Sequence, residues 1–310
     1  MPVEALHELQ ARTLELRDPS GRRIVGLCCA PPTAAAAGTV VIAPGYQRGI
    51  QHGSVLSRQL VRAGFRTVRF DLTDHVGLSD GNVRDFTLSS VATDVRTVLA
   101  ASAHRWPGPL HLIASSLAAR AAVRALARDS KLAAALERAV LVLPVIDAEH
   151  TLTRAIGTNV LAEWRTGAVT DRDELCDVLG HQVRYRFCED ALAQRLDGAA
   201  ATVKELTSLC CAVTAIAAER DDWVRLDDVH AAMGTPAEAE RETLVIEASS
   251  HDLAHNPPAM RLLLDTVLSA LAPARVDWPD ELTFEEIVET VRTERGWKRE
   301  RYAHLDQEIA

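Results

Sequence analysis

The sequence lacks the features that would place the chain in a membrane, a secretion pathway or a nucleic-acid complex. A membrane-spanning helix needs roughly 18 consecutive apolar residues, and no apolar stretch is that long. The N-terminus, MPVEALHELQ, has no basic region followed by an apolar run, so we expect no signal peptide. The formal net charge of −9 and the pI of about 5.7 argue against general binding to nucleic acids or anionic membranes.

The sequence also lacks the cysteine spacing of a redox or zinc motif. None of the six cysteines stands in a C-x-x-C pair. Both adjacent pairs lie in apolar segments, so we interpret the cysteines as buried thiols in a reducing compartment, not as disulfides or metal ligands. We therefore expect a soluble cytoplasmic protein with no cofactor and no metal ion. The cysteines are Cys28, Cys29, Cys176, Cys188, Cys210 and Cys211.

The order of apolar segments predicts an α/β fold. The chain has 310 residues, of which 47% are hydrophobic and 25% charged, enough to bury a sizeable core. Short β-branched runs alternate with longer segments of helical period, which is typical of a mostly parallel sheet with helices on both faces. The helices are expected over 54–63, 87–101, 117–128 and 259–271. The strands are expected over 13–16, 24–29, 39–43, 66–70, 110–114, 139–143, 209–217 and 244–247.

One long segment interrupts this alternation. Residues 146–207 show no clear alternation of strands and helices, and an insertion of this length in a compact domain is usually functional. We expect a core formed by 1–145 and 208–310, with 146–207 as an inserted cap or lid. Its apolar side chains either pack the insertion onto the core or line a tunnel for an acyl chain. They are Leu152, Ile156, Val160, Leu161, Trp164, Val169, Leu175, Val178, Leu179 and Phe187.

A literal G-x-S-x-G stands at Gly77–Gly81, the pattern of the nucleophile elbow of α/β-hydrolases. An elbow places its serine directly between a strand and a helix. Ser79, however, lies nine residues beyond the predicted strand 66–70, and no helix follows it. We therefore interpret this stretch as a glycine-rich loop and not as the nucleophile.

The predicted strand 110–114 leads directly into a helix through the sequence A-S-S-L-A. The positions two before and two after an elbow serine must be small, because the turn brings them together. Ser116 satisfies this requirement with Ala114 and Ala118, whereas Ser115 would be flanked by bulky residues. By itself, Ser116 could equally be an ordinary helix N-cap.

An acid and a base follow in the expected order. Asp221 and Asp222 come after the strand 209–217, and His251 comes after the strand 244–247. Serine is a weak nucleophile that needs a base, and a carboxylate orients the imidazole. The order Ser116, Asp, His is that of α/β-hydrolases. Taken singly, each residue could be a solvated turn or surface position, but together they predict a catalytic triad.

The oxyanion hole is expected to use two backbone N–H groups. One belongs to the residue after the nucleophile, Leu117, and the other to the loop after the strand 39–43. That loop reads P-G-Y-Q, where Gly45 lets the backbone turn inward and Tyr46 is the expected donor. The Tyr46 ring is also a candidate wall of the acyl pocket.

Several segments resemble the bacterial bioluminescence acyltransferases, fatty-acyl-carrier-protein thioesterases that supply myristate for aldehyde synthesis. The similar segments are LIASSLAAR, HVGLSDG, RDDWV, SSHDL and the loop APGYQR…QH, in the same order over essentially the whole chain. The resemblance implies Ser116 as nucleophile, Asp221 rather than Asp222 as acid, and His251 as base. Three positions depart from the family pattern: Ser115, Ala118 and Arg220.

These observations predict an acyl transferase or thioesterase that cleaves medium- or long-chain acyl thioesters, carried by acyl-carrier protein or CoA, through an acyl-serine. The alternatives are a carboxylesterase with the same triad, an acyltransferase of another biosynthetic pathway with a partner enzyme there, and a non-catalytic binding protein of the same fold. A basic tail segment could receive an acidic carrier, although interleaved glutamates favour a solvated helix with ion pairs. Its basic residues are Arg292, Arg295, Lys298, Arg299 and Arg301.

Overall fold

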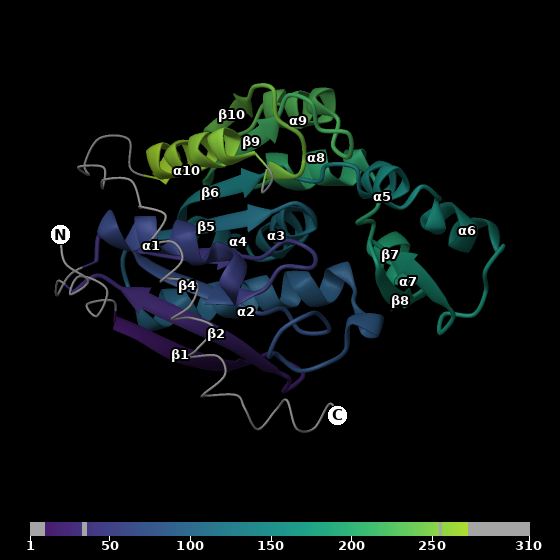
Figure 1. The fold of residues 1–310 in the computed structure, drawn as a ribbon, viewed down its shortest axis with the longest axis horizontal. Helices are drawn as coiled ribbons and strands as arrows, with labels where there is room; N and C mark the ends of the chain where they lie inside the picture. Colours follow the sequence, from purple (N-terminus) through teal and green to yellow (C-terminus); the bar gives the residue numbers. More distant parts are fainter. Residues whose placement is uncertain (1–9, 33–35, 254–255, 272–310) are drawn as a thin grey trace.

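The computed structural model describes residues 10–32, 36–253 and 256–271, which form a central sheet with helices around it (Figure 1). The predicted tail 276–310, with its basic segment, lies outside the described residues. The sheet has eight strands in the order β1-β2-β4-β3-β5-β6-β9-β10. β1 pairs antiparallel with β2 and β2 antiparallel with β4, while every other pairing is parallel. The strands are β1 (Gln10–Arg17), β2 (Arg23–Ala30), β3 (Thr39–Ala43), β4 (Arg66–Phe70), β5 (Leu110–Ser115), β6 (Leu136–Val142), β9 (Ala212–Ala218) and β10 (Arg241–Ile246).

Helices cover both faces of this sheet, so the predicted fold class is confirmed (Figure 1). The central strands are buried on both sides, and their alternate side chains enter two different cores. Val41 and Ala43 of β3 pack in the core that holds α2 and α3, whereas Val40 and Ile42 pack in the core that holds α1 and α10. The helices of the first face are α2 (Leu88–Arg105), α3 (Leu117–Ala127) and α9 (Leu226–Gly234), and those of the second are α1 (Ser54–Arg62) and α10 (Pro257–Leu271). Three short helices complete the core: η2 (Ile50–Gly53), η3 (Val83–Asp85) and α4 (Ser130–Ala135).

The segment 146–207, called the inserted segment below, lies between β6 and β9 and extends beyond one end of the sheet (Figure 1). The sequence predicted an irregular segment here, and the structure differs, since it has four helices and a two-stranded hairpin. These elements are short, so their residues show little periodicity. They are α5 (Ala148–Ile156), α6 (Val160–Thr166), β7 (Leu175–Val178), β8 (His181–Arg184), α7 (Arg186–Ala193) and α8 (Ala199–Thr207).

A buried ion-pair cluster, the Glu205 cluster, fastens the end of the inserted segment to α3. The two carboxylate oxygens of Glu205 each lie 2.6 Å from a guanidinium nitrogen, one of Arg120 and one of Arg124. Both arginines also donate to the backbone oxygen of Arg195, at 3.1 and 3.0 Å. Arg120 is fully buried. A buried charge requires a partner. Separating α3 from the C-terminal part of the inserted segment would therefore leave these buried charges unpaired.

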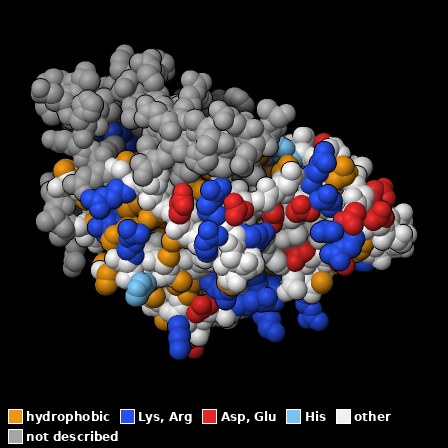
Figure 2. All heavy atoms as spheres, turned by 90° about the horizontal axis from the view of Figure 1, so that it is seen from below, with side chains coloured by type: hydrophobic (Ala, Val, Ile, Leu, Met, Phe, Trp, Pro, Cys, Tyr) orange, Lys and Arg blue, Asp and Glu red, His pale blue; other side chains and the backbone are white. Residues whose placement is uncertain are grey.

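The outer part of the inserted segment carries paired charges instead of a patch of one sign. Figure 2 shows acidic and basic side chains intermixed on the face seen from below, most densely at the end that holds the inserted segment. Arg186 pairs with Asp173 at 2.7 Å, and Arg184 pairs with Asp85. This surface offers no extended field of one sign to a charged partner.

None of the six cysteines, all of which lie in the described part of the chain, forms a disulfide, and five are buried as expected. Cys210 is exposed, which corrects the prediction for that residue, because it lies in the loop before β9 and not inside a strand. Within the described part of the chain, no helix is both long and apolar enough to cross a bilayer.

Candidate active site

Ser116 is the single residue between the end of β5 and the beginning of α3. Its backbone has φ 54° and ψ −124°, a conformation that costs residues with a Cβ about 1–3 kcal/mol. Hydrogen bonds on both sides hold this turn: the Ser116 N–H donates to Val142 O at 2.9 Å, and its carbonyl accepts from Ala119 N at 3.0 Å. The neighbouring strand β6 and the first turn of α3 thus keep the serine in a strained position.

The small flanking residues have the packing that the sequence predicts. Ala114 and Ala118 are both buried, with exposed fractions of 0% and 2%. The turn leaves no room for larger side chains at these positions. Ala118, one of the departures from the family pattern, therefore fits the turn.

The structure brings Ser116, His251 and Asp221 together, although they are far apart in the sequence. Ser116 Oγ lies 3.0 Å from His251 Nε2, and His251 Nδ1 lies 2.7 Å from Asp221 Oδ2. The other oxygen of Asp221 accepts the backbone N–H groups of Trp223 and Val224, both at 2.9 Å. These bonds fix the carboxylate so that it faces the imidazole, which then holds its proton on Nδ1 and presents Nε2 to the serine.

The carboxyl ends of β9 and β10 explain how the acid and the base meet. The two strands are parallel neighbours, so the loops that follow them lie side by side. The Arg220 N–H donates to Ser249 O at 2.8 Å and joins these loops. The Arg220 side chain is 74% exposed and lies 3.9 Å from Glu219. This departure from the family pattern therefore does not place a guanidinium against the Asp221 carboxylate.

The sequence did not single out Trp223, two residues after the acid. Its ring centroid lies 4.7 Å from that of His251, with the ring planes inclined by 34°. An indole ring packed this close to an imidazole restricts the rotation of the histidine. The tryptophan of the RDDWV segment, two residues after the predicted acid, was the signal in the sequence that could have identified it. Asp222, in contrast, is exposed.

The G-x-S-x-G stretch has a structural role, as expected. Ser79 Oγ accepts the Val25 N–H at 2.9 Å and donates to Asp71 O at 2.6 Å. Gly77 has φ +133°, and a Cβ on it would lie 2.4 Å from the Asp71 carboxyl carbon. The motif therefore fits a tight loop against β2.

The loop after β3 lies against the elbow. A Cβ built on Gly45 would come within 3.8 Å of Ser116 Cβ. Among the residues that the structure describes, the backbone N–H groups of Tyr46 and Leu117 have no hydrogen-bond acceptor. Tyr46 is buried, and its hydroxyl donates to Val178 O at 3.2 Å. Both expected donors are thus near Ser116 and available.

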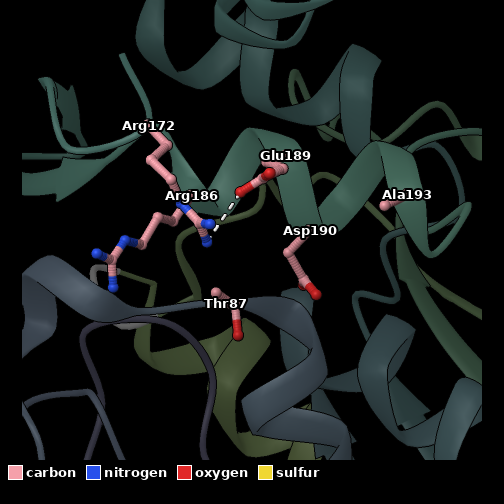
Figure 3. Close-up of a pocket in the computed structure, with 6 residues that line it drawn as sticks. All are labelled: Thr87, Arg172, Arg186, Glu189, Asp190 and Ala193. Carbon is pink, nitrogen blue, oxygen red and sulfur yellow. Dashed lines mark ion pairs between the residues drawn. The ribbon is translucent and has the colours of Figure 1, made fainter. Parts of the chain in front are cut away.

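A pocket of about 310 Å³ opens elsewhere, between α7 and the start of α2 (Figure 3). None of the residues Ser116, His251 and Asp221 lines it. Its charged groups already have partners, since Arg172 pairs with Glu189 at 3.0 Å and Asp190 accepts the Ser89 N–H at 3.0 Å. We therefore do not assign the chemistry to it. Its lining residues are Thr87, Arg172, Arg186, Glu189, Asp190 and Ala193.

Comparison with known proteins gives matches over most of the chain. A family model described as "Acyl transferase" matches residues 29–289. The acyl transferase of Photorhabdus luminescens is 28% identical over 236 residues, which cover 75% of this chain and 73% of that protein. The acyl transferase of Shewanella hanedai is 28% identical over 273 residues, which cover 86% of each chain.

Solved structures with a similar arrangement are much more distant in sequence. The Pyrococcus furiosus esterase Pf2001 superimposes with a TM-score of 0.59 at 15% identity, over 87% of this chain and 96% of that one. An alpha-beta serine hydrolase homologue from Coxiella burnetii gives 0.54 at 16% identity, over 83% and 97%. At these identities the likeness establishes the fold alone, which is that of the α/β-hydrolases.

Proposed function

Since this chain belongs to the acyl transferase family, we propose that it cleaves medium- or long-chain acyl thioesters and transfers the acyl group through Ser116. The observation that carries the proposal is the chain of hydrogen bonds from Ser116 through His251 to Asp221, at 3.0 and 2.7 Å. A serine in a strained turn, a base within reach and a fixed carboxylate are what nucleophilic acyl transfer requires.

In the first step, Ser116 Oγ attacks the thioester carbonyl carbon while its proton passes to His251 Nε2. Asp221 stabilises the imidazolium that forms. The tetrahedral intermediate then collapses, the carbon–sulfur bond breaks, and the imidazolium returns the proton to the leaving thiolate. The products are a free thiol and an acyl-Ser116.

The negative oxygen of the tetrahedral intermediate needs donors that are already in place. The proposed donors are the backbone N–H groups of Leu117 and Tyr46. Leu117 begins α3, an 11-residue helix whose N-terminus also favours negative charge. Removing one such donor from a comparable site costs about 100- to 1,000-fold in kcat.

In the second step, His251 removes a proton from the acceptor, which attacks the acyl-serine carbonyl. The ester bond to Ser116 Oγ then breaks, and the imidazolium returns its proton to the serine oxygen. Water as acceptor gives a thioesterase, and another nucleophile gives a transferase. We propose acyl-carrier protein or CoA as the source of the acyl group, and a partner enzyme of the same pathway as the recipient of the product.

The preference for longer chains rests on the inserted segment, which we propose acts as a cap over the site. An acyl chain must be shielded from water, and burial stabilises it by about 0.8 kcal/mol per CH₂. Several of its apolar residues, such as Leu161 and Phe187, are fully buried, and the Phe187 ring stacks on that of Phe86 in the core. The partly buried ones remain as candidates to line an acyl tunnel: Ile156, Trp164, Val169 and Leu179.

The test combines mass spectrometry with a series of substrates. The intact protein is mixed with acyl-CoA thioesters from about C4 to C16, since each added CH₂ should add a similar increment of binding until the tunnel is full. We expect acylation mapped to Ser116, its loss in Ser116→Ala, and normal acylation in the matched control Ser79→Ala. We also expect kcat/KM to rise with chain length and then fall.

Two results would contradict the proposal at different levels. Acylation of Ser79, or of no serine, would overturn the assignment of the nucleophile. A maximum of kcat/KM at the shortest chain, with short activated esters preferred, would leave Ser116 in place but make the protein a carboxylesterase.

A further inference from the structure

The loop beside the nucleophile contains a strained turn. The Arg48 N–H donates to Gly45 O at 3.0 Å, which closes a four-residue turn. Its third residue, Gln47, has φ 64°, a left-handed conformation that costs a residue with a Cβ about 1–2 kcal/mol. Since Gln47 carries a Cβ, other contacts must hold the turn in this shape.

The contact from the sheet side is made by His75, from the HVGLSDG segment after β4. The Gln47 N–H donates to His75 Nε2 at 3.0 Å. A histidine can accept at Nε2 only when the ring is neutral and its proton is on Nδ1. His75 is 7% exposed. Burial, helped by the nearby His181, lowers the pKa of His75 to about 4, so the ring is neutral around pH 7.

The contacts from the other side come from the turn between β7 and β8 of the inserted segment. The Tyr46 hydroxyl donates to Val178 O at 3.2 Å, and the Gln47 side-chain amide donates to Leu179 O. The Tyr46 ring also meets the His75 ring edge-on, at 5.3 Å between centroids. The turn is therefore held between the loop after β4 and the inserted segment.

We propose that His75 is a positioning residue for the oxyanion hole: by accepting the Gln47 N–H, it holds the Gly45–Arg48 turn so that the Tyr46 N–H faces the oxygen of the intermediate. The inference rests on the proposed function and assigns a role to a residue outside the triad. His75 touches no reacting atom, and it acts through the backbone of the turn.

Two substitutions distinguish the contribution of the His75 hydrogen-bond acceptor from that of its aromatic packing. His75→Phe keeps the aromatic contacts but leaves the Gln47 N–H unpaired. His75→Gln places an amide oxygen near the former Nε2 and keeps an acceptor. The matched control is His111→Phe, which replaces another histidine of low exposure (3%), at the opposite end of β5 from the elbow.

The main readout is the division of the effect between kcat and KM. We expect His75→Phe to lower kcat for the thioester about 10- to 100-fold, less than deletion of an oxyanion donor, with KM changed by less than about twofold. The affinity for a long-chain alkyl trifluoromethyl ketone, which forms a tetrahedral adduct with serine, should fall by a similar factor. His75→Gln should recover most of both losses, and His111→Phe should retain the wild-type kcat.

The protonation state of the His75 ring is tested in the wild-type protein, so the result does not depend on whether a variant folds. The ¹⁵N shifts of His75 should report a neutral ring with its proton on Nδ1 at pH 7. A proton on Nε2 would overturn the inference, as would wild-type kcat and ketone affinity in folded His75→Phe, or a His75→Gln variant no better than His75→Phe. If the wild-type protein forms no acyl-Ser116, both the proposed function and the inference that depends on it are wrong. If Ser116 is acylated equally fast in all variants, only the role of His75 fails.

Discussion

Replacement of Asp221 by asparagine should nearly abolish acylation of Ser116, because an amide cannot satisfy both sides of the site. Asp221 Oδ1 accepts two backbone N–H groups at 2.9 Å, and Oδ2 faces His251 Nδ1 at 2.7 Å. Asparagine has one acceptor oxygen and one NH₂ group. If its oxygen stays with the backbone, the NH₂ group faces Nδ1, and the imidazole must move its proton to Nε2.

With the proton on Nε2, His251 cannot accept the proton of Ser116. If the amide turned over instead, both backbone donors would meet an NH₂ group, at a cost of about 1–3 kcal/mol for each unpaired donor. The first arrangement therefore dominates. A wrong tautomer in a comparable triad lowers kcat about 10,000-fold, or about 5.5 kcal/mol in the activation free energy.

The assay is the rate of acyl-Ser116 formation, measured by quenched mixing with an acyl-CoA thioester and mass spectrometry of the intact protein. The matched control is Asp222→Asn, which makes the same chemical change one residue away at an exposed position. We expect the control to acylate within about twofold of the wild-type rate, as for most surface substitutions. A greater loss in Asp222→Asn, or a loss of less than about tenfold in Asp221→Asn, would refute the reasoning.

Three further predictions concern stability, each measured by urea unfolding. Ser116→Gly should be inactive but more stable than Ser116→Ala by about 1 kcal/mol, because glycine relieves the strained backbone of the elbow; equal stabilities would contradict this. Burial raises the pKa of the Asp94 carboxyl, which accepts from Thr73, to about 7, against 3.8 when exposed. The folded state then binds the proton more tightly, so this group's contribution to stability declines as pH rises from 3.8 to 7. The stability of Asp94→Asn relative to the wild type should rise across this range by at most about 4 kcal/mol, and a flat difference would contradict the assignment. Glu205→Ala should cost about 3–5 kcal/mol, because it leaves the buried Arg120 and Arg124 without a counter-charge, and a loss below about 1 kcal/mol would show that the cluster contributes little.

The sequence predicts the framework well where strands are buried and helices are long. The strands 39–43 and 66–70 are found at the predicted residues, because runs such as TVVIA leave few alternatives in a parallel sheet. Boundaries shift where neighbours decide them: β6 begins at Leu136 instead of the expected residue 139. The helix α9 was missed, because its nine residues are too few to show a clear helical period.

The candidate site was predictable for a different reason. Residues at the carboxyl ends of parallel strands must meet at one edge of the sheet, so the order of Ser116, Asp221 and His251 implied their proximity. Their catalytic roles and the oxyanion donors stay predictions. The contacts of His75, in contrast, could not be foreseen, because they depend on how two loops and the inserted segment pack against each other.

The Glu205 cluster determines where this chain can be recombined with its relatives. Arg120 and Arg124 lie on the helix that begins next to the nucleophile, while Glu205 and Arg195 lie on the inserted segment. A chimera that took the whole of 146–207 from another protein would need to supply a new counter-charge for both arginines, or lose about 3–5 kcal/mol of stability. A crossover confined to the outer helix α6 would leave the Glu205 cluster unchanged. We expect directed evolution of acyl preference to succeed through exchanges of this outer part and to fail when the junctions fall beyond α7.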